Sequence, residues 1–276
     1  MLFNSIDFAL FLPIVFIIYW IVNQYFSLKI QNVVLLVASY IFYAWWSWKF
    51  LFLILISSCC DYFIGRKLFN TTNNTHRRIL LYSSIMVNLG LLSFFKYFNF
   101  FIENFVSVFT FFGSPISSHG LNIILPVGIS FYTFQTLSYT IDVYNRKINS
   151  SNSLISFFAF VSFFPQLVAG PIERASNLLP QFNQTRRFSY QQASDGMKQI
   201  LWGLFKKVVI ADNCAEYVNM CFNSPLDHSG STLLIGAALF SFQIYGDFSG
   251  YSDTAIGVSK LFGFTLKKNF DFPYFS

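Results

Sequence analysis

The sequence predicts an all-α, polytopic membrane protein with about eight membrane-embedded helices, at about 20 residues per spanning helix. Of its 276 residues, 54% are hydrophobic and only 11% are charged. A soluble domain usually carries about 25% charged residues. The chain therefore has too little polar surface to cover a water-soluble globule of this size. Apolar stretches of spanning length recur along the chain, and we treat residues 1–276 as a single membrane domain.

The apolar stretches follow one another with short connections. They lie near residues 8–26, 33–47, 49–64, 79–98, 121–143 and 231–246. The first is longer than the apolar core of a signal peptide, so we expect a retained span. The second and third meet at Ser47 beside Trp45, Trp46 and Trp48. Tryptophans cluster at the membrane–water interface, so this cluster predicts a tight turn between two helices.

Two weaker stretches, 154–169 and 197–222, are expected to form short re-entrant or interfacial helices. They are interrupted by Pro165, Gly203, Lys206 and Lys207. Broken apolar segments at membrane depth occur where the backbone is buried in protein or lines a cavity.

Basic residues indicate the orientation of the chain in the membrane. The stretch 66–78 contains Arg66, Lys67, Arg77 and Arg78 and no acidic residue, which predicts a cytoplasmic loop under the positive-inside rule. Counting spans backward from this loop puts the N-terminus outside. Because the aromatic residues lie within the apolar segments, away from the basic residues, we expect no nucleic-acid partner.

A polar, glycine-containing run at 243–253 interrupts the last apolar stretch. Polar groups in such a place usually line a pathway or a site, because lipid offers them no hydrogen-bond partners. Helical spacing would put Asp247, Gly250, Tyr251 and Thr254 on one face. Helix packing through Gly246 and Gly250, or helix capping, is the alternative interpretation. The candidates for a tunnel lining or its support are Gln243, Asp247, Tyr251, Ser252 and Asp253.

A second run, residues 164–174, combines helix breakers with charged residues. Its prolines and glycine free backbone groups from helical hydrogen bonds. We expect either a helix end with a surface ion pair between Glu173 and Arg174 or a re-entrant hairpin at the mouth of a cavity. The candidates for this vestibule are Pro165, Gln166, Gly170, Pro171, Glu173 and Arg174.

No residue of the chain is assigned a catalytic or metal-binding role. The four cysteines show no CxxC spacing, which excludes the common zinc and redox frameworks. Asp227, His228 and Ser229 are consecutive, so they cannot converge on one reacting atom as a triad must. His76 and His119 also lie in predicted loops.

Three long stretches, together with the N-terminal sequence MLFNSIDFALFLPIVFIIYW, resemble the membrane-bound O-acyltransferase family. The stretches are LPVGISFYTFQTLSYTIDVY (125–144), FFPQLVAGPIERASNLLPQF (163–182) and FSFQIYGDFSGYSDTAIGVSKLFGF (240–264). Within the family they are most similar to the branch of bacterial alginate O-acetyltransferases. The resemblance covers nearly the whole chain.

The resemblance implies a partial ring of helices around a tunnel through the bacterial inner (plasma) membrane. It implies O-acetyl transfer from a cytoplasmic donor, acetyl-CoA or another acyl thioester, toward an exported polysaccharide such as alginate or a cell-wall polymer. It also implies an extracytoplasmic, hydrolase-like partner that completes the transfer, and no bound cofactor.

The histidine that the resemblance implies as catalytic falls beyond Ser276, so we expect a fragment that is inactive alone. A non-catalytic transport or scaffold component is the alternative, because acidic residues at membrane depth can also line a transport path.

Overall fold

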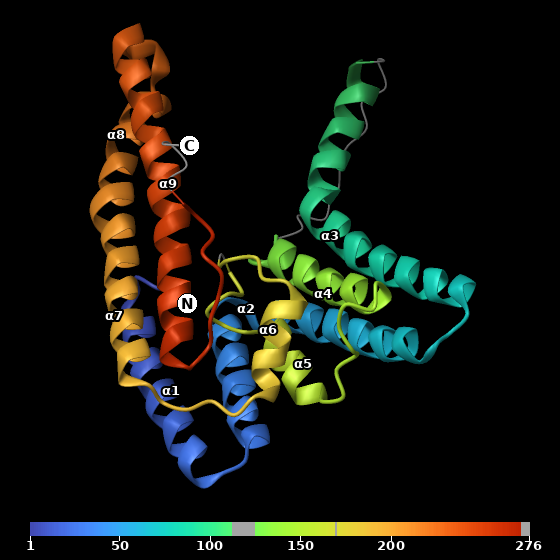
Figure 1. Cartoon of the computed structure of the whole chain (residues 1–276). Coiled ribbons are helices and arrows are strands. Elements are labelled where there is room, and N and C mark those ends of the chain that lie inside the picture. Colours follow the sequence, from blue (N-terminus) through green and yellow to red (C-terminus); the bar gives the residue numbers. More distant parts are fainter. Residues whose placement is uncertain (112–124, 169, 272–276) are drawn as a thin grey trace.

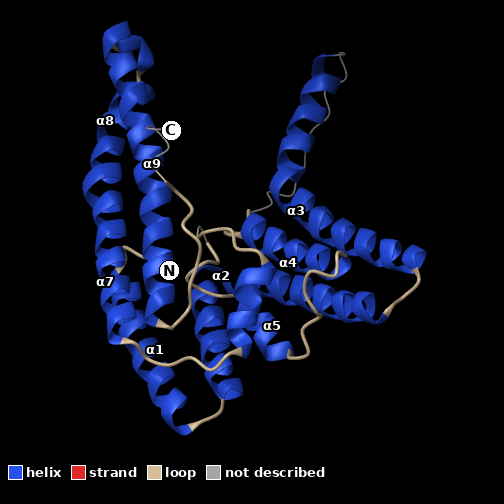
Figure 2. Cartoon of the chain, in the orientation of Figure 1, coloured by secondary structure: helices blue, strands red, loops and turns tan. Residues whose placement is uncertain are grey.

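The computed structural model describes residues 1–111, 125–168 and 170–271. Figure 2 shows only helices and loops in this part of the chain, with no strand. The predicted all-α class is therefore confirmed.

Three helices of the described residues are long and apolar enough to cross a membrane: α1 (Ile6–Tyr25), α2 (Leu28–Asn70) and α3 (Asn74–Phe111). Ser47 interrupts α2 with an extended backbone, at φ −162° and ψ 112°. The two halves of α2 run in different directions (Figure 1). The turn predicted beside the tryptophans is thus present, and Trp45, Trp46 and Trp48 are all exposed. The count of about eight embedded helices stays a prediction.

The stretch 66–78 differs from the loop that its polarity predicted. Helix α2 continues to Asn70 and α3 begins at Asn74, which leaves only residues 71–73 as a connection. Arg77 is buried, and its guanidinium donates to the carbonyl oxygens of Leu68 (2.8 Å) and Tyr144 (2.5 Å). These carbonyls lack intrahelical partners because they end helices, so the arginine caps α2 and a second helix, α4 (Ile129–Tyr144).

Short helices fill the centre of the molecule. They are α4 (Ile129–Tyr144), α5 (Leu154–Val161) and α6 (Ala175–Leu178), which a 3₁₀ turn at Leu179–Asn183 extends. Helix α5 and the turns that follow it are almost wholly buried. The prediction of a short, broken segment between 154 and 169 is therefore confirmed for its described residues.

The C-terminal part is a pair of long helical columns (Figure 1). The first column is continuous: α7 (Tyr190–Leu204), a π-helical segment (Phe205–Ala211) and α8 (Asp212–Asn223). After a 3₁₀ turn at Pro225–Asp227, α9 (Gly230–Leu261) packs along this column. Gly263, at φ 77°, then turns the chain back at the end of α9. A π segment therefore replaces the break predicted within 197–222.

A buried polar cluster joins α2, α3 and α4. Asp61 accepts hydrogen bonds from the hydroxyl of Ser84 (2.5 Å) and the amide of Asn88 (2.7 Å). The Asn88 side-chain oxygen in turn accepts from Ser57 (2.9 Å) and Thr136 (3.0 Å). Since unsatisfied polar groups are costly away from water, these contacts fix how the three helices pack.

Replacing Asp61 with alanine is expected to lower the free energy of unfolding in detergent by about 2 kcal/mol, since the buried donors Ser84, Asn88 and Thr140 lose this acceptor. Thermal unfolding of the purified protein measures this loss. Asp195→Ala provides the control, because Asp195 is exposed and its lysine partner lies 3.8 Å away. Equal stability of the two variants would contradict the role given to the cluster.

Candidate functional site

Helices α7 and α9 touch backbone to backbone through glycines. A Cβ atom on Gly203 would lie 2.5 Å from the carbonyl oxygen of Gly250, and one on Gly257 would lie 2.6 Å from that of Gly196. A Cβ on Gly246 would lie 3.0 Å from the carbonyl oxygen of Lys206. The close helix packing predicted from Gly246 and Gly250 is therefore confirmed.

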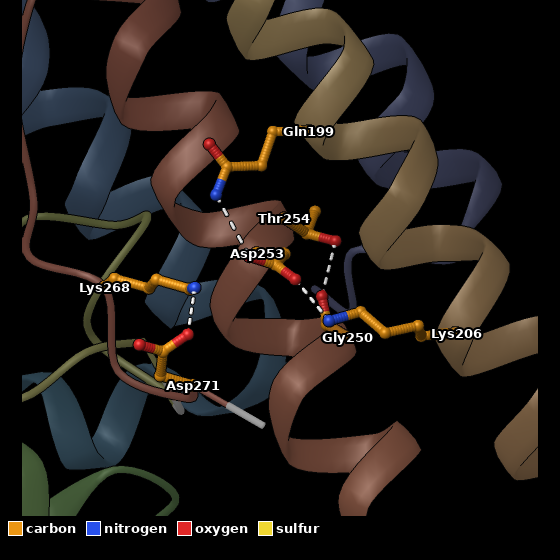
Figure 3. A network of polar contacts seen from close by, with 7 residues as sticks. All are labelled: Gln199, Lys206, Gly250, Asp253, Thr254, Lys268 and Asp271. Carbon is orange, nitrogen blue, oxygen red and sulfur yellow. Dashed lines mark hydrogen bonds and ion pairs between the residues drawn. The ribbon is translucent and has the colours of Figure 1, made fainter. Parts of the chain in front are cut away.

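The π-helical segment brings two consecutive lysines to carboxylates on α9. The ammonium of Lys206 donates to Asp253, whose other oxygen accepts from the amide of Gln199 at 3.0 Å (Figure 3). Lys207 lies 2.6 Å from a carboxylate oxygen of Asp247. Such wide turns recur at functional sites, where they change the direction in which side chains point.

The two ion pairs differ in exposure. The side chain of Lys206 is 7% exposed and that of Asp253 is 19% exposed. Lys207 is about one-third exposed, and it also binds Asp212 at 2.8 Å. The Lys206–Asp253 pair is thus a largely buried ion pair that joins the first helical column to α9. The Lys207–Asp247 pair is partly exposed and borders open space.

That open space is a cavity of about 370 Å³ beside α9. Asp247, Gly250, Tyr251 and Thr254 all line it, so the helical face predicted from the sequence is confirmed. The rest of the wall is mostly apolar and is made by Leu2, Phe3, Asn4, Val168, Leu204, Lys207 and Phe248. We call this space the α9 cavity.

Several polar atoms of α9 are buried without a partner among the described residues. They are the hydroxyl oxygens of Ser249, Tyr251 and Ser252 and the side-chain oxygen of Gln243. The Tyr251 ring stacks on Phe3, with a centroid distance of 4.4 Å. A helix that carries unpaired polar atoms is unfavourable as a purely structural element, because each atom costs desolvation energy.

The five tunnel candidates thus occupy different surroundings. Asp247 and Tyr251 line the α9 cavity, whereas Gln243, Ser252 and Asp253 are not part of its wall. Asp253 instead forms the largely buried ion pair with Lys206. A role for all five in one tunnel stays a prediction.

The predicted vestibule segment is buried more deeply than a surface loop. Pro165, Gln166, Gly170 and Pro171 are buried, and the side-chain oxygen of Gln166 lies 3.5 Å from the amide of Gln135. Position 170 has no room for a side chain, since a Cβ on Gly170 would lie 2.6 Å from the Cα atom of Gln166.

Glu173 has a different partner from the one expected of a surface ion pair. It is buried, whereas Arg174 is exposed, and no ion pair joins them within the described residues. The Glu173 carboxylate accepts from the side chain of Asn177 (2.7 Å) and from the backbone amide of Lys267. It therefore holds the stretch that follows α9 against the centre of the molecule.

Arg186 is a buried cation that the sequence analysis missed. Its guanidinium donates to the side-chain oxygens of Asn32 (2.5 Å) and Gln31 (3.0 Å), and it lies 4.7 Å from the ring centroid of Phe264. Burial lowers the pKa of Arg186 below its ordinary value. The arginine joins α2 to the segment after α9.

The sequence analysis also missed Lys206 and Lys207, which it treated as interruptions of an apolar stretch. The available signal was two lysines within an apolar stretch and two aspartates in the run 243–253, since buried charges are normally paired. His76 is exposed, whereas His228 is half-buried and its ring Nε2 lies 3.0 Å from the carbonyl oxygen of Met220. His119 lies outside the described residues.

Comparison with known proteins identifies the family, although no family model matches the chain. The chain is 41% identical over its whole length to "Probable alginate O-acetylase AlgI" from Pseudomonas putida, of which it covers 56%. Over 99% of the chain it is 37% identical to "Peptidoglycan O-acetyltransferase" from Helicobacter pylori, of which it also covers 56%. A weaker match, 25% identical over 56% of the chain, is to "Teichoic acid D-alanyltransferase" from Bacillus subtilis, of which it covers 40%.

The chain spans about half the length of the curated relatives it matches most strongly. The match to each of these relatives extends over all or nearly all of this chain. Helices long and apolar enough to span a membrane, and a helix pair packed through glycines, fit a membrane protein of this kind. The chain belongs to the membrane-bound O-acyltransferase family.

Proposed function

We propose that this chain forms part of an enzyme that transfers an acyl group, acetyl above all, to a hydroxyl of an exported polysaccharide or cell-wall polymer. The donor is a thioester, acetyl-CoA or another acyl thioester. Its C–S bond breaks, a C–O ester bond forms to the acceptor, and the hydroxyl proton ends on the released thiol. The relatives support this proposal, since they are named for alginate, peptidoglycan and teichoic acid.

The observation that carries the proposal is the α9 cavity in a membrane protein of this family. Ligand sites are typically concave and largely apolar, with a few placed polar groups. The Asp247–Lys207 pair supplies polar groups here, and Tyr251 lines the same cavity. In the proposed enzyme they orient the acyl group along its path, while Asp253 holds α9 in position through Lys206.

We further propose that the protein lies in the bacterial inner membrane with its N-terminus outside. The donor then binds on the cytoplasmic side, where the segment 165–174 forms the vestibule. A hydrolase-like protein outside the membrane completes the transfer to the polymer. The lipid bilayer is the remaining partner, because the apolar faces of α1, α2 and α3 are exposed.

Asp247→Asn is expected to lower acyl transfer about tenfold, since the variant keeps the shape of the side chain but loses a charge-assisted hydrogen bond. Lys207 keeps its second partner, Asp212, so the fold is retained. The measurement is ester-linked acetate on the exported polymer, made with the complete enzyme of which this chain is part, in bacteria that produce alginate or O-acetylated peptidoglycan and lack their own O-acetylase.

The matched control is Asp195→Asn, which removes an exposed carboxylate of α7. Its acetate content should equal that of the wild type. A complete wild-type enzyme that adds no acetate to either polymer would refute the proposed function. An unchanged rate in Asp247→Asn would remove the α9 cavity from the reaction path.

A further inference from the structure

A second cavity adjoins the α9 cavity. It has a volume of about 440 Å³ and lies between the start of α1 and the break in α2. Its wall includes Ser5, Asp7, Trp45 and Trp46. Leu2 and Val168 line both cavities, so these two side chains form the wall between them.

Leu2 is held in place by the residues around it. Its carbonyl oxygen accepts from both the backbone amide (3.1 Å) and the hydroxyl (2.7 Å) of Ser5. The next residue, Phe3, is buried and stacks on Tyr251. The side chain of Leu2 is nonetheless 61% exposed, as expected of a residue that borders open space.

Val168 is fixed from the opposite side. It follows Leu167, which is buried and presents its carbonyl oxygen to Gly128. A Cβ on Gly128 would lie 2.6 Å from that oxygen, so the two segments meet at backbone distance. Both residues are therefore anchored through backbone contacts nearby, and their apolar side chains line both cavities.

The two cavities are chemically unlike. The α9 cavity carries the Asp247–Lys207 ion pair, whereas the second cavity carries Asp7 beside the exposed tryptophans of the predicted interface. A path from one to the other would run from the charged face of α9 to the membrane surface near the N-terminus.

We propose that Leu2 and Val168 form the constriction of one passage and set the size of the acyl group that the enzyme transfers. This inference rests on the proposed function. Apolar walls discriminate between homologous groups through each added methylene, which is worth about 10–200-fold in specificity. An acetyl group is the shortest of the common acyl groups, and longer groups would contact both side chains.

The test compares acetyl, propionyl and butyryl thioesters of coenzyme A as donors, with the same polymer acceptor and the same membrane preparation of the complete enzyme of which this chain is part. Val168→Ala shortens a side chain and so widens the constriction; it is expected to raise the butyryl-to-acetyl ratio of kcat/KM about tenfold. Leu2→Phe enlarges a side chain and so narrows the constriction; it is expected to lower the propionyl-to-acetyl ratio of kcat/KM by a similar factor. The ratio is an internal reference, since a loss of folded protein lowers both rates equally.

Two controls carry the same substitutions on exposed positions that line neither cavity. They are Val37→Ala on α2 and Leu10→Phe on α1. Altered ratios in the wall variants alone would support the constriction. Active variants with the wild-type ratios would overturn it and leave the proposed function intact. A complete wild-type enzyme that transfers no acyl group from any donor would refute both.

Discussion

Replacing Lys206 with alanine is expected to lower the free energy of unfolding in detergent by about 3 kcal/mol. The reason is that Asp253 would keep its charge at a largely buried position without the cation that compensates it. The loss of a partner is costly because the remaining charge cannot regain its hydration. The amide of Gln199 still donates to Asp253, which limits the effect.

Thermal or denaturant unfolding of the purified protein measures this change. The double variant Lys206→Ala, Asp253→Ala should recover part of the loss, since it removes both charges together. Lys198→Ala is the control, because its partner Asp195 is 53% exposed and such surface pairs contribute about 0–1 kcal/mol. A double variant no more stable than Lys206→Ala would show that the two residues are not coupled.

Gly203→Ala is expected to cost about 2 kcal/mol of stability and to disrupt the packing of α7 on α9. The added Cβ would lie 2.5 Å from the carbonyl oxygen of Gly250, which is backbone and cannot rotate away. The two helices must separate, and the contact between Lys206 and Asp253 would weaken with them.

A glycine-to-alanine substitution at another position should raise the stability of the protein rather than lower it. Gly90 lies within α3, and a Cβ there would meet nothing within 4 Å. Gly90→Ala should therefore stabilise the protein by about 0.5–1 kcal/mol, because alanine loses less backbone entropy in a helix. Unfolding curves of the two variants, compared with the wild type, measure both effects. Destabilisation by Gly90→Ala, or none by Gly203→Ala, would contradict this account of the interface.

The features that the sequence predicted correctly depend on local patterns. The low charge content predicted the helical membrane class, and the tryptophans predicted the break at Ser47. Three-and-four spacing predicted which residues of α9 share a face, and Asp247 and Tyr251 do line one cavity. Helical periodicity is fixed by backbone geometry, so it can be read from one sequence.

The features that the sequence did not predict depend on contacts between distant segments. Glu173 binds a backbone amide 94 residues away, and Arg186 binds a side chain 155 residues away. The π-helical segment shifts the register of the residues that follow it, so regular spacing could not pair Lys206 with Asp253. The polar run also lowers the hydropathy of α9, which is why length and composition do not mark this helix as a span.

The central claim is that polar residues of α9 face a water-filled cavity rather than lipid, and cysteine labelling tests it most directly. Phe248 and Phe240 both lie on α9 and are exposed to similar extents, 52% and 46%, but only Phe248 lines the α9 cavity. Each is replaced by cysteine in a variant whose four native cysteines are serines, and membrane vesicles are treated with a charged, water-soluble thiosulfonate. The account predicts rapid labelling of Phe248→Cys and none of Phe240→Cys, because lipid excludes the reagent. Protection of Phe248→Cys from both faces of the membrane, or equal labelling of the two positions, would contradict it.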